Sequence, residues 1–328
     1  MKKPYHVLVL GNVRPEGLDI LRGFSELTIL PEPARKADIL AAIPKADAIL
    51  HKIAKTDAEV ISAQTKVQVI ARHGVGLDDL DLDSIRAANI PVSITPAANS
   101  NAVAEATLGL TLAALHKFSQ GERMIKESRA WARENLMGRE LAHSTVGIVG
   151  FGRIGQRTAR LFHAFGARVV VYDAVPEILG DCSYDTASLD ALLAQSDVVC
   201  LHCPLMPSTR HMMNDARIRQ MKANAILVNT SRGGLIDTMA LTRAITSGTI
   251  AGAALDVFDA EPPDFDDPLF QLPQVVTTPH LAAMTEEAQI AMAIGAANEI
   301  RRVLVDKIGP TNNIFALSTN PQRSPASG

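Results

Sequence analysis

The stretch VGIVGFGRIGQRTARLFHAFGARVVVYD, from Val146 to Asp173, decides how the middle of this chain folds. An apolar segment runs into Gly150, and Gly152 and Gly155 complete the pattern G-x-G-x-x-G. A segment with helical periodicity follows, and a second apolar segment then ends in the acidic Asp173. This order of strand, glycine turn, helix, strand and acid is typical of a βαβ unit that binds a dinucleotide.

Each part of that stretch has a physical role in the predicted site. Gly150 permits a tight turn, Gly152 lets the backbone approach a pyrophosphate, and Gly155 lets helix and strand pack closely. The N-terminus of the helix offers amide N–H groups and a positive dipole end to the phosphates. Asp173 is placed to hold the ribose hydroxyls and would repel a 2′-phosphate, which favours NAD(H) over NADP(H). The alternative is a glycine-rich turn in another doubly wound domain.

Segments with strand and helix character alternate on both sides of this unit. Repeated β-α units predict parallel sheets with helices on both faces, so the expected fold class is α/β. Strands are expected at residues 6–10, 26–30, 46–50, 67–72, 90–94, 146–150, 168–173, 197–202, 225–229, 251–256 and 274–279. Helices are expected at residues 15–23, 34–43, 56–64 and 81–89, as one long helix over 99–123, and from near Arg153, Ser188, Asn214, Asp237 and Thr285.

Length and charge narrow the function classes. A chain of 328 residues is long enough for about two domains. Its formal net charge of −3 offers no basic surface for nucleic acid or an anionic membrane. The apolar run near the N-terminus is too short for a secretory signal and is interpreted as a first strand. A cytoplasmic protein without nucleic-acid or membrane partners is therefore expected.

The C-x-x-C pair formed by Cys200 and Cys203 is interpreted as structural. Residues three apart on a strand point to opposite faces, so one metal ion or one disulfide does not easily use both. The chain holds three cysteines, an odd and low count that argues against a disulfide framework. No metal site is expected.

Three loops in the second half carry the residues that hydride-transfer chemistry on a 2-oxo acid requires. Arg232 follows one predicted strand, Glu261 lies after the next, and His280 follows the last. Arginine can grip a carboxylate and a carbonyl oxygen together, and histidine can exchange a proton near neutral pH. A carboxylate beside the imidazole raises the histidine pKa and can fix its tautomer.

Each of these residues also has a less specific interpretation. A lone His280 is more simply a buried histidine with a satisfied hydrogen bond, Arg232 a surface ion-pairing residue, and Glu261 a solvated carboxylate. Ligands bind at the carboxyl ends of strands in such sheets, however, and all three residues follow strands beside a nucleotide fingerprint. Together they favour a catalytic set.

The first hundred residues offer a candidate anion site. Gly74, Val75 and Gly76 follow a predicted strand and could present backbone N–H groups to a carboxylate. The alternative is an ordinary turn. His51 and Lys52 end another strand and could line the same site. His73 is expected to pack locally, and His202 is not proposed as the acid because no carboxylate lies near it in the sequence.

Seven segments match the blocks of one protein family in that family's order, namely HGVGLDDLD, NAVAEATLG, VGIVGFGRIGQ, LHCPLMPSTR, NTSRGGLID, ALDVFDAEPP and TTPHLAAMTEEA. From Val7 to Ile314 the chain resembles the D-isomer-specific 2-hydroxyacid dehydrogenases. Phosphoglycerate dehydrogenases and hydroxypyruvate/glyoxylate reductases belong to that family.

The resemblance implies roles for particular residues. Arg232 would bind and orient the substrate, His280 would be the acid/base, and Glu261 its partner. Val75 and Gly76 would hold the substrate carboxylate through their N–H groups. The residues expected at the cofactor are Gly150, Gly152, Arg153, Ile154, Gly155, Asp173, Cys203, Thr230, Asp256, His280 and Ala283, with Asp256 near the carboxamide.

The resemblance also implies an architecture and an assembly. A Rossmann NAD-binding domain at 99–286 would be inserted into a flavodoxin-like substrate domain at 1–98 plus 287–318, with a cleft between the two doubly wound domains. Residues 319–328 are expected to be a disordered tail. Family members are commonly dimers joined through the cofactor domain, which would place Trp131 near the interface.

The choice of substrate stays open at this point. Many phosphoglycerate-type members have an arginine near the position of His51 or Lys52, and often Asn where Asp79 stands. A phosphate-specific pocket is therefore not predicted, although Lys52 could bind an anion. Two other functions are kept as alternatives: a nucleotide-sensing, corepressor-like binding protein on this fold, and a formate- or phosphite-type dehydrogenase.

Overall fold

A computed structural model describes residues 3–180 and 182–317 of the chain. The described residues form two compact units. Unit 1 is built from both ends of the chain, up to Asn99 and from Thr285 on, and unit 2 is Ser100–Met284. The predicted borders were 98/99 and 286/287. The tail predicted to be disordered, residues 319–328, lies outside the described residues.

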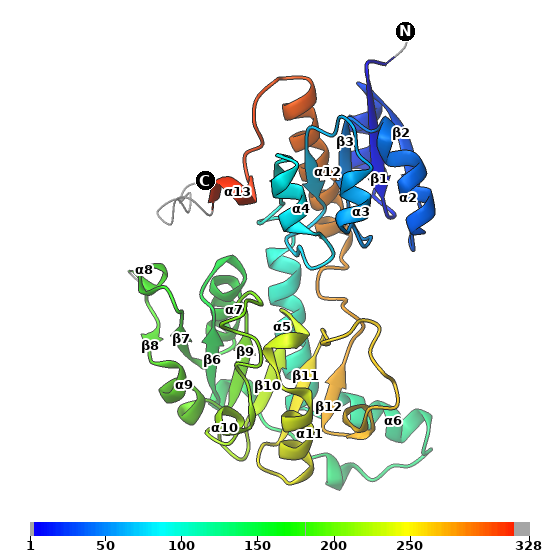
Figure 1. Ribbon diagram of the computed structural model, residues 1–328. Coiled ribbons are helices and arrows are strands. Elements are labelled where there is room, and N and C mark those ends of the chain that lie inside the picture. Colours follow the sequence, from blue (N-terminus) through cyan, green and yellow to red (C-terminus); the bar gives the residue numbers. More distant parts are fainter. Residues whose placement is uncertain (1–2, 181, 318–328) are drawn as a thin grey trace. The chain divides into compact units, whose positions relative to one another are not determined.

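Unit 1 holds a five-stranded parallel sheet in the order β2-β1-β3-β4-β5, drawn in blue and cyan in Figure 1. Its strands are β1 (Tyr5–Leu10), β2 (Ser25–Leu30), β3 (Ala48–His51), β4 (Ile70–Arg72) and β5 (Val92–Ser93). Its helices are α1 (Pro15–Arg22), α2 (Lys36–Ala42), α3 (Ala58–Ser62), α4 (Leu82–Ala87), α12 (Glu286–Leu304) and α13 (Ile314–Leu317), with a 3-10 turn at Ile43–Lys45. This strand order is the flavodoxin-like one, as predicted.

The returning helix α12 belongs to the core of unit 1. It packs on α1, β3 and β4. Gly17 of α1 permits the close approach, because a Cβ at that position would lie 2.6 Å from the carbonyl oxygen of Ala293. Residues from both ends of the chain thereby bury one continuous apolar cluster.

Unit 2 holds a seven-stranded parallel sheet in the order β12-β11-β10-β9-β6-β7-β8. Its strands are β6 (Thr145–Val149), β7 (Arg168–Tyr172), β8 (Asp185–Thr186), β9 (Val198–Leu201), β10 (Ile226–Asn229), β11 (Gly252–Leu255) and β12 (Val275–Thr277). The strand order reverses between β6 and β9, which is the switch point where Rossmann sheets bind dinucleotides. The predicted α/β class with two parallel sheets is confirmed.

Helix starts in unit 2 follow from their capping residues. The helices are α5 (Ser100–Leu115), α6 (Phe118–Lys126), α7 (Arg153–Ala164), α8 (Pro176–Leu179), α9 (Leu189–Gln195), α10 (Asp215–Ile218) and α11 (Thr238–Thr246). Ser188, Asn214 and Asp237 each accept a hydrogen bond from a first-turn N–H with their side chains, and Thr285 does so for α12. The predicted starts are confirmed. Further 3-10 turns lie at Arg133–Leu136, Leu141–His143, Gly233–Leu235 and Pro268–Gln271.

The single helix predicted over 99–123 is wrong. Lys117 has φ of 58°, in the left-handed region, and separates α5 from α6. The carbonyl oxygen of Leu115 accepts a hydrogen bond from Arg139 N–H at 3.0 Å. Gly138 allows this approach, since a Cβ there would lie 2.6 Å from the same oxygen. A segment distant in sequence thus occupies the carbonyl at the end of α5.

Alternate strand residues of unit 2 fill two separate apolar clusters, one on each face of the sheet. Cys200 lies in the cluster with Ile148 and Val228, whereas Cys203 packs against the one with Val149 and Leu227. The two cysteines therefore face different cores, as strand geometry predicted. No helix among the described residues is long and apolar enough to cross a membrane.

Candidate active site

Six loops at one edge of the unit 2 sheet carry the predicted site residues. Each loop follows a strand: β7 ends before Asp173, β6 before the glycine motif, and β9 before Cys203. The loops after β10, β11 and β12 carry the remaining residues: Arg232, Asp256, Glu261 and His280. Because the strands are parallel, these loops share the carboxyl edge of the sheet, which is where ligands bind in such folds.

The glycine motif has the geometry that a pyrophosphate site requires. Gly150 has φ of 94°, and a Cβ there would lie 2.7 Å from the carbonyl carbon of His202. A Cβ on Gly155 would lie 2.0 Å from the carbonyl oxygen of Gly150. Gly152, at the N-cap of α7, has no atom within 4 Å of the position its Cβ would take. That open space beside a helix N-terminus fits the phosphates of NAD(H).

Asp173 is held in place at the end of β7. Its Oδ2 accepts a hydrogen bond from Phe151 N–H at 2.8 Å, and its Oδ1 accepts one from Val175 N–H at 2.9 Å. The carboxylate is partly exposed and lies directly beside the glycine motif. Its position is suited to accept hydrogen bonds from ribose hydroxyls.

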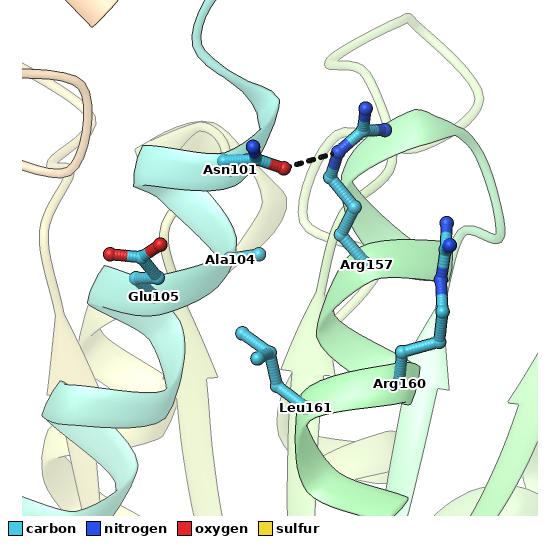
Figure 2. A pocket seen from close by; sticks show the side chains of 6 residues that line it. All are labelled: Asn101, Ala104, Glu105, Arg157, Arg160 and Leu161. Atoms are coloured by element: carbon cyan, nitrogen blue, oxygen red, sulfur yellow. Dashed lines mark hydrogen bonds between the residues drawn. The ribbon is translucent and has the colours of Figure 1, made fainter. Parts of the chain in front are cut away.

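A groove of about 290 Å³ lies between α5 and α7, next to the motif. Figure 2 shows Arg157 reaching toward α5, where its Nε donates to Oδ1 of Asn101 at 2.6 Å. Arg153, Arg157 and Arg160 lie along α7, and none of them forms an ion pair with a described residue. Their charges lie beside the glycine motif, and Glu105 of α5 lines the same groove with the opposite charge.

His280 and Glu261 form a hydrogen-bonded pair. His280 Nδ1 lies 2.7 Å from Glu261 Oε2, and Glu261 Oε1 accepts a hydrogen bond from Phe258 N–H at 3.1 Å. The side chains are 50% and 37% exposed, so the outer nitrogen of the ring can reach a small molecule. This is the geometry of an imidazole oriented by a carboxylate.

The pair shifts both pKa values in the direction that keeps it charged. The hydrogen bond to Glu261 raises the pKa of His280 above its ordinary value, and the charges of Glu261 and Asp256 add to this against burial and Arg232. Burial acts to raise the pKa of Glu261, but the hydrogen bond from His280 and the other contacts hold it below its ordinary value. His280 is therefore stabilised as imidazolium near neutral pH.

Asp256 organises the loop that carries His280. It is 1% exposed, and its Oδ1 accepts hydrogen bonds from the Thr278 hydroxyl at 2.6 Å and from Leu281 N–H at 2.7 Å. Its Oδ2 accepts one from Ala282 N–H at 2.9 Å, and its backbone oxygen accepts His280 N–H at 2.8 Å. These bonds stabilise His280 in a left-handed backbone conformation with φ of 54°. This role of Asp256 is not predicted from the sequence, where its indication is a carboxylate directly after a buried strand.

The loop after β10 holds Arg232 by side-chain to backbone bonds. The Asn229 side chain accepts from Ser231 N–H at 3.0 Å and donates to the Arg232 carbonyl at 2.8 Å. The Ser231 hydroxyl donates to the Cys203 carbonyl at 2.7 Å, which ties this loop to the one after β9. The Arg232 charge lowers the pKa values of both His280 and Glu261, as a smaller contribution than their mutual hydrogen bond.

Gly233 allows the Arg232 loop to lie against the loop that carries Glu261. A Cβ on Gly233 would lie 1.9 Å from the carbonyl carbon of Phe258, the residue whose N–H bonds to Glu261. Any side chain at Gly233 would therefore separate the two loops. The sequence analysis did not single out this glycine, although the pair of glycines after Arg232 is a visible signal.

The remaining predicted cofactor residues line the same edge. Thr230 is 8% exposed and its hydroxyl lies 2.8 Å from that of Thr107. Burial raises the pKa of Cys203 to about 11, so this thiol is not an acid/base at neutral pH. Burial lowers the pKa of His202 to about 4, and its Nε2 has no hydrogen-bond partner among the described residues. Arg153 is exposed and Ile154 and Ala283 are partly buried.

The unit 1 candidates divide into a buried and an accessible set. His51 is fully buried, with Nε2 3.0 Å from Ala54 O and Nδ1 2.5 Å from an Arg72 nitrogen, which argues against direct contact with a substrate. Lys52 lies in an ion pair of 3.4 Å with Glu32 and keeps some exposure. His73 is buried, and its Nε2 lies 3.3 Å from the Gln289 carbonyl of α12, a partner distant in sequence rather than a local one.

Val75 and Gly76 lie in an exposed loop after β4. Val75 is 38% exposed, and Gly74 before it has φ of 126°. Val75 is thus open to solvent, and Gly76 is partly exposed. These two residues lie in unit 1 and the His280 group lies in unit 2, and each is described within its own unit.

Comparison with known proteins identifies the family. Residues 108–282 match the model for "D-isomer specific 2-hydroxyacid dehydrogenase, NAD binding domain". The chain is 38% identical over 304 residues to a hydroxypyruvate reductase of Thermotoga maritima, covering 92% of this chain and 98% of that protein. The chain therefore belongs to the D-isomer-specific 2-hydroxyacid dehydrogenase family, and the predicted NAD-binding domain is confirmed.

Two further relatives place the chain within that family. A D-3-phosphoglycerate dehydrogenase of Mycobacterium tuberculosis is 40% identical over 307 residues, which are 93% of this chain and 58% of that protein. The chain thus spans 58% of the length of this relative. A crystal structure of D-lactate dehydrogenase from Aquifex aeolicus, complexed with NAD and lactic acid, superposes with a TM-score of 0.79 at 30% identity, covering 91% of this chain and 95% of that one.

Proposed function

We propose that this protein is an NAD-dependent oxidoreductase that interconverts a D-2-hydroxy acid and its 2-oxo acid. The observation that carries the proposal is the 2.7 Å pair of His280 Nδ1 and Glu261 Oε2, at the sheet edge that also holds the dinucleotide fingerprint. A protein that only sensed a nucleotide would have no need of a polarised acid/base pair there. Family membership supports the same class of reaction.

The roles follow from charge and geometry. NAD(H), when bound, supplies or takes up the hydride. In the direction of reduction His280 is imidazolium, and its outer N–H donates a proton to the carbonyl oxygen of the substrate. In the direction of oxidation the neutral ring accepts the hydroxyl proton. Glu261 fixes the tautomer through Nδ1, and Arg232 binds the carboxylate and polarises the carbonyl.

Unit 1 contributes the anion loop in this proposal. The N–H groups of Val75 and Gly76 bind the substrate carboxylate, as in other backbone anion sites. Lys52 is the candidate cation for a second anionic group on the substrate. His51, being buried, would act only by supporting its neighbours. The cytoplasmic location stays a prediction.

A screen of 2-oxo acids tests this function. NADH oxidation should be measured with glyoxylate, hydroxypyruvate, phosphohydroxypyruvate, sulfopyruvate, pyruvate and branched 2-oxo acids. We expect turnover with at least one of them. Tight NADH binding without turnover of any would contradict the proposal and favour the nucleotide-sensing alternative, and turnover of formate or phosphite alone would favour that other class.

Asp173 is predicted to set the choice of NADH over NADPH. Its carboxylate would lie against a 2′-phosphate, and such like charges disfavour binding strongly. Asp173→Asn removes the charge and keeps one acceptor oxygen, so it preserves one of the two bonds from Phe151 and Val175 N–H. We expect the ratio of NADPH to NADH dissociation constants, measured by fluorescence titration, to fall about 10-fold or more. A wild-type preference for NADPH would rule out this role.

The apolar surface around α6 is proposed to bind a second copy of the chain. None of the α6 residues is buried, and Ile125, Trp131 and Met137 are 51%, 78% and 81% exposed. Helix α6 contacts the 3-10 turn at Arg133–Leu136, so these exposed apolar residues belong to one region, and large exposed apolar groups are typical of interfaces. Ile125→Asp should convert a dimer into a monomer in sedimentation velocity, whereas Met239→Asp, at an exposed methionine of α11, should not. A wild-type monomer at micromolar concentration would contradict the proposal.

A further inference from the structure

Thr95 and Gly74 are joined by three hydrogen bonds. Thr95 N–H donates to the Gly74 carbonyl at 2.9 Å, and the Thr95 hydroxyl donates to the same oxygen at 3.2 Å. That hydroxyl also accepts from Gly74 N–H at 2.9 Å. Thr95 is 7% exposed, so water does not compete for these bonds. Thr95, which follows β5, thus bonds both backbone polar groups of Gly74, and the Gly74 N–H also donates to the Arg72 carbonyl at 3.0 Å.

The bonds to the Gly74 carbonyl also orient the next N–H group. A peptide unit is planar, so the C=O of Gly74 and the N–H of Val75 point in opposite directions within one rigid plane. Two donors from Thr95 hold that oxygen, and the Val75 N–H is thereby aimed away from Thr95. Gly74 has φ of 126°, where glycine alone is comfortable, so local preference does not set the loop.

Helix α12 fixes the conformation of Thr95 in turn. A Cβ on Gly295 would lie 2.9 Å from the Thr95 Cγ2 methyl, closer than side chains pack. Because threonine is β-branched, the position of the methyl decides the position of the hydroxyl. Because Gly295 has no side chain, the Thr95 methyl can lie against α12, and in that position the Thr95 hydroxyl reaches Gly74.

The same helix supports the loop at two other points. His73 Nε2 lies 3.3 Å from the Gln289 carbonyl, and the Met292 Sδ lies 3.7 Å from the position a Gly74 Cβ would take. The loop is therefore seated on one side of α12, in successive turns. Thr95 links the loop to α12 and also bonds the peptide unit that precedes the proposed anion site.

We infer that Thr95 is a positioning residue for the substrate carboxylate, and that Gly295 is required for it to act. Thr95 aims the Val75 N–H without touching the substrate. The inference rests on the proposed function, since it takes Val75 and Gly76 to bind a 2-oxo acid.

The first test compares Thr95→Val with Thr95→Ser. Valine keeps the shape and the backbone bond to the Gly74 carbonyl but removes the hydroxyl, which leaves Gly74 N–H with the Arg72 carbonyl as its one acceptor. With the best substrate of the oxo-acid screen, we expect KM to rise about 10-fold for Thr95→Val, with kcat and the NADH dissociation constant within about 3-fold of wild type. Thr95→Ser keeps the hydroxyl, so the KM of this variant should stay close to the wild-type value.

The matched control is Ser25→Ala in the same unit. Ser25 is fully buried and its hydroxyl donates to the Leu21 carbonyl at 2.8 Å, at the amino end of β2. The Ser25→Ala variant loses a buried hydroxyl, as Thr95→Val does, and the KM of Ser25→Ala should not change. If KM rose equally in Ser25→Ala and Thr95→Val, the effect of Thr95→Val would come from a general loss of stability. That result would overturn the inference.

The second test uses the contact with Gly295. Gly295→Ala should push the Thr95 methyl and raise KM about as much as Thr95→Val. Adding Thr95→Ser to Gly295→Ala removes the methyl and should lower KM again, a coupling that independent sites do not show. If the double variant keeps the high KM of Gly295→Ala, the link through Thr95 is wrong.

Hydrogen exchange separates this inference from the proposed function. Exchange of the segment that contains Gly74 should become faster in Thr95→Val and stay as in wild type in Thr95→Ser. Unchanged exchange in Thr95→Val would refute the anchor even in an active enzyme. If wild type turns over no 2-oxo acid, the proposed function fails and the substrate role of Thr95 fails with it, while exchange still decides whether Thr95 holds the loop.

Discussion

Replacing His280 by asparagine is expected to lower kcat for 2-oxo acid reduction about 10²- to 10⁴-fold, the range that acid–base groups contribute. His280 is the only candidate acid at the described sheet edge that is both accessible and paired with a carboxylate, at 2.7 Å. His202 is held neutral by burial, and the Cys203 thiol has a pKa of about 11. Neither can take over the proton transfer.

Asparagine is a better replacement for His280 than alanine because of the backbone conformation at this position. His280 has φ of 54°, a conformation that asparagine tolerates far better than alanine does. The hydrogen bonds that Leu281 and Ala282 N–H donate to Asp256 can therefore persist. The NADH dissociation constant should change by less than about 3-fold. Steady-state kinetics with fluorescence titration measure both quantities. A His280→Asn enzyme with wild-type kcat would exclude His280 from the chemistry.

Local chemistry explains how much of the fold the sequence predicts. The glycine motif, the acid at Asp173 and the capping side chains act within a few residues of themselves, so their spacing is visible in one dimension. The capping residues Ser188, Asn214 and Asp237 start helices where predicted for this reason. The two-residue strand β8 and the one-turn helix α8 were missed. Helix α8 has no side-chain cap, unlike the equally short α10, and both residues of β8 are exposed, so no apolar run indicates a strand there.

Features that depend on distant segments could not be predicted. The helix predicted over 99–123 is interrupted where Arg139 N–H donates a hydrogen bond to the Leu115 carbonyl. The sequence near Leu115 does not indicate that Arg139 is its partner. Gly233 and Gly295 are glycines because of what packs on them, Phe258 and Thr95, and each partner is remote in sequence. Such positions resemble ordinary glycines until the packing is known.

The candidate site shows the same division. Arg232, Glu261 and His280 were singled out because reactive residue types follow successive strands of a parallel sheet. The supporting bonds were not foreseen: Asp256 was expected near a carboxamide, and both of its oxygens accept hydrogen bonds from the His280 loop. A residue's type indicates what chemistry it can perform, whereas its partners depend on loop conformations that no pattern records.

Glu261→Gln is expected to lower kcat for reduction about 10²-fold at pH 8 and by less at pH 6. The Glu261 hydrogen bond is the main cause of the raised His280 pKa. Reduction needs imidazolium, so activity is present below that pKa and falls as pH rises through it. Without the carboxylate the pKa drops, and the alkaline limb of the reduction profile moves to lower pH.

Oxidation of the 2-hydroxy acid has the opposite pH dependence, but its limb is expected to move in the same direction. It needs neutral imidazole, so the lower His280 pKa of Glu261→Gln moves the acid limb of the oxidation profile to lower pH as well, and the loss should be smallest at low pH. Asp259→Asn is the matched control, because this carboxylate lies in the same loop but pairs with Arg210 at 3.2 Å. Its profiles should keep the wild-type limbs. Limbs that stay in place in Glu261→Gln would mean that Glu261 does not set the His280 pKa, and the 2.7 Å pair would then serve orientation alone.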